Sequence, residues 1–340
     1  MRIALVCPYN LDRPGGVATH VLGLARWLNA TGHEAKVVAP GTRAPKDVPV
    51  LLLGPTRDFR FNGSTAQLAV SASQRTAARA AVQGVDVVHV HEPLTPGAAY
   101  TAAKAASPLV VTHHASFTVP AMVAPLLRYR AKKLGPRLSL AVSEAAARTA
   151  QAAVGHRPPI IPNAIRLPDA RPPLRSDTPR VVFLGRRDDP RKGYAVFHAL
   201  AQSGIEADFV AIGPGGDPGP GVRSLGILDD ERLSEELRGS SVVVASNLGG
   251  ESFGMVLIEA LAAGCTLVAS DLPAVREVVG GTPVARWFRP GETDAARAAL
   301  LSALGEPADP DQARLVARRY AWESIGPRIV GIYRASLGMH

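Results

Sequence analysis

Two glutamates flank a glycine-rich turn in the segment 249–264. Glu251 follows Gly249 and Gly250, and Glu259 comes eight residues later, inside a run (253–263) whose apolar residues recur at helical spacing. Amides at the start of a helix are unpaired and partly positive, so this end can bind a phosphate or a sugar oxygen. Two acids about two turns apart can also accept hydrogen bonds from hydroxyls of one extended polar ligand. An amphipathic helix with one solvated acid and one acid favoured by the helix dipole fits equally well, and the segment alone leaves both interpretations open.

A second turn, within 183–193, carries cations. A strand is expected to end at Gly185, and Arg186 and Lys192 flank the turn that leads into the next helix. Arg binds phosphate oxygens as a fork and Lys as a point charge. The pair could therefore neutralise a diphosphate, although solvated loop cations would give the same pattern.

Glycines and histidines follow strands of the first half. Gly16, the second of a Gly pair between the first expected strand and a helix, allows the backbone to approach a ligand closely, whereas a plain turn is the alternative. The segment matches neither the dinucleotide fingerprint nor a P-loop. His113 and His114 follow another strand without an acid at zinc spacing, so we expect no metal site there. For His89 we expect a structural role in the sheet packing.

Short β-rich runs alternate with helical runs in both halves of the chain, which predicts parallel, doubly wound sheets. In the first half, strands are expected at 3–6, 36–39, 50–53, 85–90, 109–112 and 138–142, and helices at 17–30, 65–82, 96–106, 121–133 and 144–154. In the second half, strands are expected at 181–184, 207–212, 241–245, 266–269 and 284–288, and helices at 192–202, 230–238 and 253–263, with three more from Asp294, Asp309 and Trp322.

The domain organisation follows from an interruption at 168–179, where four prolines and mixed charges show no periodicity. We expect an N-terminal Rossmann-like domain over 1–167, this linker, a second Rossmann-like domain over 180–322, and a C-terminal helix over 323–340 that crosses back to the first domain. A chain of 340 residues is long enough for two domains. Ligands of such sheets bind at the carboxyl ends of the strands, so we expect the active site in the cleft between the domains.

Composition narrows the function classes. The net charge of +9 is scattered and aromatic residues make up only 5%, which argues against nucleic acid as a partner. Apolar runs are far shorter than the roughly 18 residues that a spanning helix needs. The N-terminus lacks the apolar region of a signal peptide, and the two cysteines, Cys7 and Cys265, have no metal spacing. We expect a cytoplasmic protein with reduced thiols.

Five motifs occur in one order along nearly the whole chain. They are Pro14-Gly15-Gly16-Val17, His91-Glu92-Pro93, His114, Gly185-Arg186 with Pro190-Arg191-Lys192-Gly193, and Glu251-Ser252-Phe253-Gly254 with Glu259. In this order they resemble the retaining glycosyltransferases of family four, which have the two-domain GT-B fold. Within that family, the chain is most similar to the actinobacterial branch that transfers mannose to phosphatidyl-myo-inositol.

The resemblance implies a role for each motif residue. Arg186, Lys192, Glu251 and His114 would be catalytic, with the two cations holding the diphosphate. Donor binding would add Gly16 at the diphosphate, Glu259 at the ribose, Asp230 at the guanine edge of a GDP-sugar, and Ser252, Phe253, Gly254 and Met255 at the sugar and phosphate. The acceptor would contact Tyr9, Asp12, Asn62 and Ser64. No metal or cofactor would be required, and the partners would be GDP-mannose or another nucleotide sugar and a lipid or small-molecule acceptor.

The acceptor side departs from the phosphoinositol pattern at three positions. Gln67 replaces an Arg, Val119 a Lys and Leu94 an Asn. Losing phosphate-binding cations leaves a glycoside or natural product open as acceptor, with a UDP- or GDP-sugar as donor. The membrane-facing helix of that branch is rich in Lys and Arg, whereas 66–82 holds only Arg75 and Arg79. The basic, partly apolar segment 126–133 could dock on the inner face of the cell membrane or be a solvated helix face.

A non-catalytic nucleotide-sugar-binding protein on the same scaffold is the alternative class of function. It would have no need to keep all of the predicted catalytic and ribose-binding groups, which are present here. We therefore expect an enzyme, a hexosyltransferase.

Overall fold

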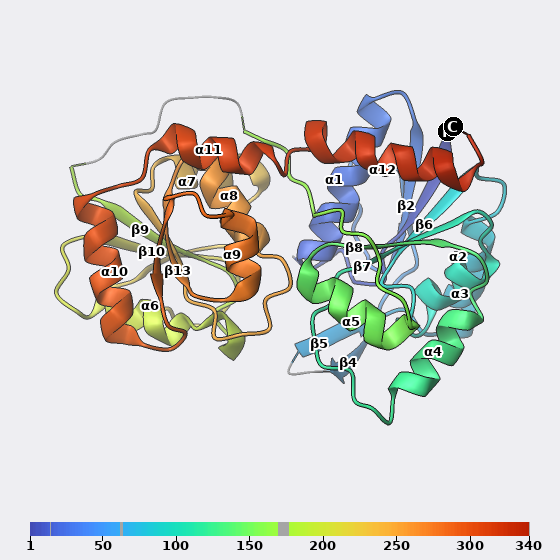
Figure 1. Ribbon diagram of the computed structural model, residues 1–340, viewed down its shortest axis with the longest axis horizontal. Helices are drawn as coiled ribbons and strands as arrows, with labels where there is room; N and C mark the ends of the chain where they lie inside the picture. Colours follow the sequence, from blue (N-terminus) through green and yellow to red (C-terminus); the bar gives the residue numbers. More distant parts are fainter. Residues whose placement is uncertain (14, 62–63, 169–176, 340) are drawn as a thin grey trace. The chain divides into compact units, whose positions relative to one another are not determined.

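Apolar strands and amphipathic helices alternate through the chain and build two six-stranded parallel sheets (Figure 1). The computed structural model describes residues 1–13, 15–61, 64–168 and 177–339. It divides into two units. Unit 1 comprises Met1–Ala164 and Trp322–His340, and unit 2 comprises Ile165–Ala321.

The sheet of unit 1 has the order β3-β2-β1-β6-β7-β8, and all its pairs are parallel. Successive residues of a strand face opposite sides of a sheet, and both sides are apolar here, as in a sheet covered by helices on both faces. Ile3 and Leu5 pack into one core, and Ala4 and Val6 into another. The strands are β1 (Arg2–Val6), β2 (Glu34–Ala39), β3 (Val50–Leu52), β6 (Val87–His91), β7 (Leu109–His113) and β8 (Leu138–Ala141).

The helices of unit 1 cover both faces of this sheet. Helices α1 (Gly16–Ala30) and α12 (Trp322–Ser336) share one core, and α2 (Ala72–Ala81) and α3 (Ala98–Ala105) share the other. Helix α4 (Ala124–Lys132) packs against α5 (Glu144–Val154). The last helix of the chain thus belongs to the same unit as the first strand, as Figure 1 shows.

Unit 2 repeats the plan with the sheet order β11-β10-β9-β12-β13-β14. Helices α6 (Tyr194–Ala201) and α10 (Thr293–Gly305) share an apolar core with one face of the sheet. Helix α8 (Met255–Ala263) packs on β12 and β13 and also contacts α7 (Asp230–Arg238), α9 (Pro273–Val279) and α11 (Pro310–Arg318). The strands are β9 (Arg180–Leu184), β10 (Asp208–Ile212), β11 (Arg223–Gly226), β12 (Val242–Ala245), β13 (Thr266–Ser270) and β14 (Ala285–Phe288).

The helix expected at 65–82 is wrong in its first half. Residues 64–68 form strand β5 (Ser64–Leu68), which pairs antiparallel with β4 (Arg57–Phe61), and neither strand was expected. Ser71 ends the extended stretch, because its hydroxyl accepts from the Gln74 amide while the Gln74 side chain accepts from the Ser71 amide. This capping box starts α2 at Ala72.

Candidate functional site

The chemistry-bearing loops of unit 2 leave neighbouring strands. Strand β9 lies between β10 and β12, so the strand order reverses between β9 and β12. Open parallel sheets bind ligands outside the carboxyl ends of their strands at such a switch point. The loop after β9 carries Arg186 and Lys192, and the loop after β12 carries Asn247 and Glu251.

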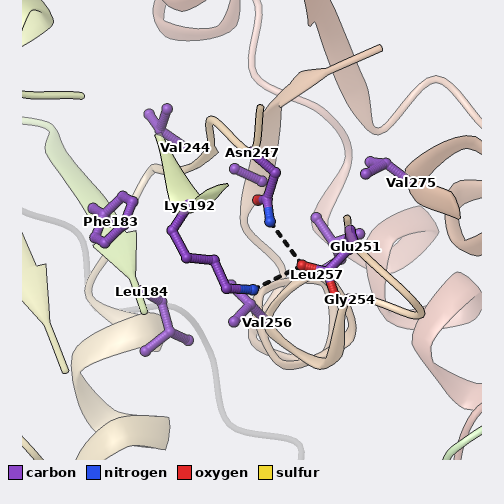
Figure 2. A pocket seen from close by; sticks show the side chains of 11 residues that line it. Phe183, Leu184, Lys192, Val244, Asn247, Glu251, Gly254, Val256, Leu257 and Val275 are labelled. Carbon is purple, nitrogen blue, oxygen red and sulfur yellow. Dashed lines mark hydrogen bonds and ion pairs between the residues drawn. The ribbon is translucent and has the colours of Figure 1, made fainter. Parts of the chain in front are cut away.

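Lys192 and Glu251 meet at this edge of the sheet. The Lys192 Nζ lies 2.8 Å from Glu251 Oε2, and the Asn247 amide donates to the same oxygen at 2.7 Å. Figure 2 shows both side chains converging on the carboxylate from opposite sides. The three polar groups line a small pocket together with apolar side chains that include Leu184 and Leu257.

The Glu251 carboxylate is held in its ionised form. Its side chain is 15% exposed, and burial favours the neutral acid, but the Lys192 ammonium and the backbone amides of Phe253 and Ser252 outweigh that effect. The pKa of Glu251 therefore lies below its ordinary value. The site combines a fixed negative charge with a cation and polar N–H groups around it.

The turn that carries Lys192 is held by its neighbours. Pro190–Lys192 form one turn of 3₁₀ helix, which Asp189 caps by accepting from the Arg191 amide. The Ser246 hydroxyl donates to the carbonyls of Lys192 and Gly193 at 3.2 and 2.9 Å. Gly193 has φ +65°, and a Cβ there would lie 1.9 Å from the Ser246 carbonyl oxygen, so only glycine fits. The expected helix at 192–202 accordingly begins later, at Tyr194.

The two arginines after Gly185 differ in their surroundings. The Arg187 guanidinium donates to the carbonyls of Gly213, Gly215 and Gly216, which makes it a structural brace for that loop. The Arg186 side chain is 45% exposed, and its Nε lies 3.6 Å from Asp188 Oδ1. Arg186 is thus the arginine of this loop that a ligand can reach.

The predicted donor-binding residues 252–255 lie at the start of α8. The helix begins at Met255 rather than at Phe253, with Gly254 as its N-cap at φ +86°. Phe253 is buried with its ring 5.6 Å from that of Tyr320, and its amide is engaged by Glu251. Ser252 is half-buried.

Glu259 and Asp230 belong to two helices that contact each other. Asp229 caps α7 by accepting from the Arg232 amide, and Asp230 is the first residue of that helix. Glu259 is half-buried, two-thirds of the way along the turns of α8. Burial, followed by the negative charge of Asp230, raises the pKa of Glu259 to about 7. The structure thus brings these two predicted nucleotide-binding acids into electrostatic reach of each other.

In unit 1, His114 lies just after β7, and Glu92 holds its backbone. Glu92 has φ +50°, and its Oε1 accepts from the amides of His114 and Ala115. Burial raises the pKa of Glu92, and the two amides partly offset that effect. The His114 ring is buried, with its Nε2 2.9 Å from the Nδ1 of His91.

His89 is structural, as expected. Its Nδ1 lies 2.8 Å from the Tyr333 hydroxyl and its Nε2 2.7 Å from the Thr112 hydroxyl, and the ring is 1% exposed. Gly16 is exposed at the start of α1, where no described side chain caps the helix. Cys7 and Cys265 are buried free thiols, and burial raises the pKa of each to about 12.

The predicted acceptor-binding residues are only partly described. Asp12 is exposed and accepts from the amides of Thr42 and Arg43, which also stabilises that loop. Tyr9 is half-buried beside Glu92, and burial, with the charge of Glu92 second, raises its pKa. Ser64 is the first residue of β5, and Asn62 lies outside the described residues.

Comparisons with known proteins agree with this arrangement. The model of Glycosyltransferase Family 4 matches residues 14–167, and that of Glycosyl transferases group 1 matches residues 178–306. A phosphatidyl-myo-inositol mannosyltransferase of Mycolicibacterium smegmatis is 36% identical over 99% of this chain and 95% of its own. One from Propionibacterium freudenreichii is 36% identical over 98% of this chain and 94% of its own. The chain belongs to glycosyltransferase family 4.

The solved structures support the same fold. Anabaena HepE in complex with UDP and glucose has a TM-score of 0.75 and 17% identity, covering 98% of this chain and 100% of that one. This family 4 glycosyltransferase has the GT-B fold, with two Rossmann-like units, and is a hexosyltransferase. Within the described ranges, no helix is long and apolar enough to cross a membrane.

Sequence reasoning about this family 4 glycosyltransferase missed two polar residues. Asn247 binds the same oxygen of Glu251 as Lys192 does. The signal was present, because Asn247 stands two residues beyond the end of β12, where ligand-binding groups gather. Glu92 was noted only as part of a motif, and its hold on the His114 backbone depends on a positive φ that residue type does not predict.

Proposed function

We propose that the protein transfers mannose from a nucleotide-diphosphate sugar, preferably GDP-mannose, to a hydroxyl of phosphatidylinositol or a related acceptor, with retention of anomeric configuration. The observation that carries the proposal is the Lys192–Glu251 pair at the switch point of unit 2, with Arg186 on the same loop. The names of the mannosyltransferase relatives support mannose as the sugar.

Charge development explains why these groups suit glycosyl transfer. Cleavage of the anomeric C–O bond puts positive charge on the sugar ring and negative charge on the leaving diphosphate. The cations Lys192 and Arg186 and the amides at the start of α8 would stabilise the diphosphate, and Glu251 would bind the donor sugar. The acceptor hydroxyl attacks from the face of the leaving group, and the departing diphosphate takes up its proton. This step needs neither a protein nucleophile nor a metal ion.

The preference for guanine rests on Asp230. A carboxylate can accept from the N1–H and the amino group of guanine, which uracil and adenine do not present in the same pattern. Asp230 is exposed at the start of α7, and its charge acts on Glu259, the proposed ribose ligand. The two acids would therefore contact adjoining parts of one nucleoside.

A glycoside or another uncharged acceptor is the second candidate. The residue at the position of the phosphate-binding arginine is Gln67, which accepts from the Asn10 amide and donates to Asp58 at 2.7 Å. These bonds tie Gln67 into the β4–β5 hairpin, and its side chain carries no positive charge for a phosphate. Leu94 and Val119 likewise supply no cation.

Peripheral membrane contact would suit a lipid acceptor, and α4 offers a surface for it. Met122, Leu126 and Tyr129 are exposed apolar side chains next to the exposed cations Lys132 and Lys133. The surrounding stretch 93–143 contains six basic residues and no acidic one. A patch that combines apolar side chains with positive charge can bind an anionic membrane surface.

Two panels of ligands test the proposal. Thermal shifts with GDP, UDP and ADP should show the largest stabilisation for GDP, and stabilisation by UDP alone would contradict the role of Asp230. Transfer from GDP-mannose should then be measured with phosphatidylinositol, inositol and water-soluble glycosides. Transfer only to the glycosides would favour the second candidate, and NMR of the anomeric proton in the product would report retention or inversion.

A further inference from the structure

Four histidine side chains pack together inside unit 1. His20 comes from α1, His89 and His91 from β6, and His114 from the residue after β7. The His91 ring is stacked on His89 with centroids 4.3 Å apart and lies 5.1 Å from the ring of His114. The His20 ring lies 5.7 Å from His91 and 5.5 Å from His114. All four side chains are at most 5% exposed.

The cluster is uncharged at neutral pH. Burial is the largest influence and lowers the pKa of each ring, and the neighbouring imidazoles lower those of His89, His91 and His114 further. A neutral imidazole carries one N–H and one bare nitrogen. Every hydrogen bond in the cluster therefore depends on which nitrogen of each ring holds the proton.

The contacts of His91 restrict its tautomer. Its Nδ1 lies 2.9 Å from the Nε2 of His114, and these two nitrogens share one proton. Its Nε2 is buried without a hydrogen-bond partner among the described residues. With the proton on Nε2, His91 would bury an N–H that has no acceptor, which costs about 1–3 kcal/mol. Buried N–H groups without a partner are rarer in proteins than acceptors without one, so the proton belongs on Nδ1.

The tautomer of His114 follows from that of His91. If His91 donates from Nδ1, the His114 Nε2 accepts and the single proton of the His114 ring is on Nδ1. Any hydrogen bond from this ring to a ligand then runs through Nδ1, and the ring acts as a donor. Sugar hydroxyl oxygens and phosphoryl oxygens are the acceptors that such a donor fits.

We propose that His91 is a positioning residue that holds His114 as the Nδ1–H tautomer, so that His114 presents an N–H to an oxygen of the donor sugar. The second half of this proposal rests on the proposed function, because it assigns the donor sugar to His114. The first half concerns the protein alone. Glu92 fixes the backbone of His114, and His91 fixes the proton and orientation of the ring.

Three substitutions of His91 separate positioning from packing. His91→Asn keeps an N–H close to the place of Nδ1, His91→Gln moves the amide towards the place of Nε2, and His91→Phe fills the space without a donor. With purified full-length protein labelled with ¹⁵N-histidine, long-range ¹H–¹⁵N spectra report which nitrogen of each ring is protonated. His114→Asn identifies the signals of His114, and His89→Gln serves as the control within the cluster.

We expect His114 to be protonated on Nδ1 in the wild type, in His91→Asn and in His89→Gln, and to change its pattern in His91→Phe. We expect kcat/KM for the nucleotide sugar to fall by up to about 10²-fold in His91→Phe and to be largely retained in His91→Asn, since misplacing one contact group can cost that much. His114 protonated on Nε2 in the wild type would overturn the proposal. So would equal losses of activity in His91→Asn and His91→Phe at equal thermal stability. Because the spectra need no substrate, a failure to find mannosyl transfer would leave the tautomer result standing and count against the proposed function alone.

Discussion

Asp230 acts electrostatically on Glu259, since its negative charge and the burial of Glu259 together raise the pKa of the Glu259 carboxyl to about 7. An acid with a higher pKa in the folded than in the unfolded chain binds its proton more tightly when folded. The stability that this group contributes is therefore present below its ordinary pKa of 4.5 and is lost as the pH rises through 7. We expect Glu259→Gln to be more stable than the wild type at about pH 8, with the difference vanishing near pH 4, in thermal unfolding measured across this range.

The same titration should appear in ligand binding. Ribose hydroxyls donate to the ionised form of Glu259, so we expect the affinity for a nucleotide sugar to increase from about pH 6 to about pH 8. Glu259→Gln should bind more weakly and without this dependence, in isothermal calorimetry at each pH. A nucleotide sugar is the appropriate ligand because its diphosphate has no proton that titrates near neutral pH. An unchanged pH dependence in Glu259→Gln would remove Glu259 from the binding site.

Lys192 and Arg186 should matter far more for turnover than for folding. Removing one preorganised charge that stabilises the transition state typically costs about 10²–10³ in kcat, and we expect this loss in Lys192→Ala and in Arg186→Ala. Lys192→Ala should also raise the pKa of Glu251, which would lose its nearest cation. Arg297→Ala, on the exposed side of α10, is the matched control and should keep wild-type turnover. Near-normal turnover in both loop variants would refute their assignment to the diphosphate.

The two doubly wound sheets were predictable because their signals are local. Buried parallel strands are short apolar runs, and such runs were found for β1, β6 and β12 close to their final bounds. Strands without an apolar run were missed. β11 reads Arg-Ser-Leu-Gly at the edge of its sheet, and β4 and β5 pair mainly with each other. Their structure depends on pairing between segments, which periodicity along one segment does not reveal.

The candidate site could be predicted in its residue types but not in its contacts. Lys192 and Glu251 are 59 positions apart, and only the neighbouring positions of β9 and β12 bring them to 2.8 Å. The His91–His114 contact likewise depends on the pairing of β6 with β7. The distinction between Arg186 and Arg187 could not be made either, because it depends on three carbonyls of a distant loop.

The exposed apolar and basic side chains of α4 predict binding to anionic vesicles. Each Lys near an anionic surface contributes about 1 kcal/mol, so Lys132→Ala/Lys133→Ala should weaken binding by about 30-fold. Leu126→Asp should weaken it further, because it removes apolar contact and adds repulsion. Cosedimentation with vesicles of phosphatidylglycerol and phosphatidylcholine measures both effects.

Helix α2 provides the control for this experiment. Its two exposed or half-exposed arginines, Arg75 and Arg79, are the corresponding cations on another helix of unit 1. Arg75→Ala/Arg79→Ala should bind vesicles like the wild type if α4 is the docking surface. The reverse ranking of the two double variants would assign docking to α2 instead.

Glycines on α1 and α12 each face a tryptophan of the other helix. A Cβ on Gly326 would lie 2.5 Å from the ring of Trp27, and one on Gly23 would lie 2.9 Å from the ring of Trp322. Real Cβ contacts are never that short, so the helices would have to move apart. Forcing extra atoms into a packed core typically costs about 1–3 kcal/mol, and we expect Gly326→Ala to destabilise unit 1 by this amount.

Gly331 makes this prediction sharp, because it lies in the same helix with nothing within 4 Å of a Cβ. Gly331→Ala should instead stabilise the protein by up to about 1 kcal/mol through higher helix propensity. Urea unfolding followed by tryptophan fluorescence suits both variants, since Trp27 and Trp322 are two of the three tryptophans. Trp27→Leu should rescue part of the loss in Gly326→Ala, because a smaller side chain makes room for the added methyl group. Equal effects of the two alanine substitutions would show that helix propensity, and not the close approach of α1 and α12, governs the stability of α12.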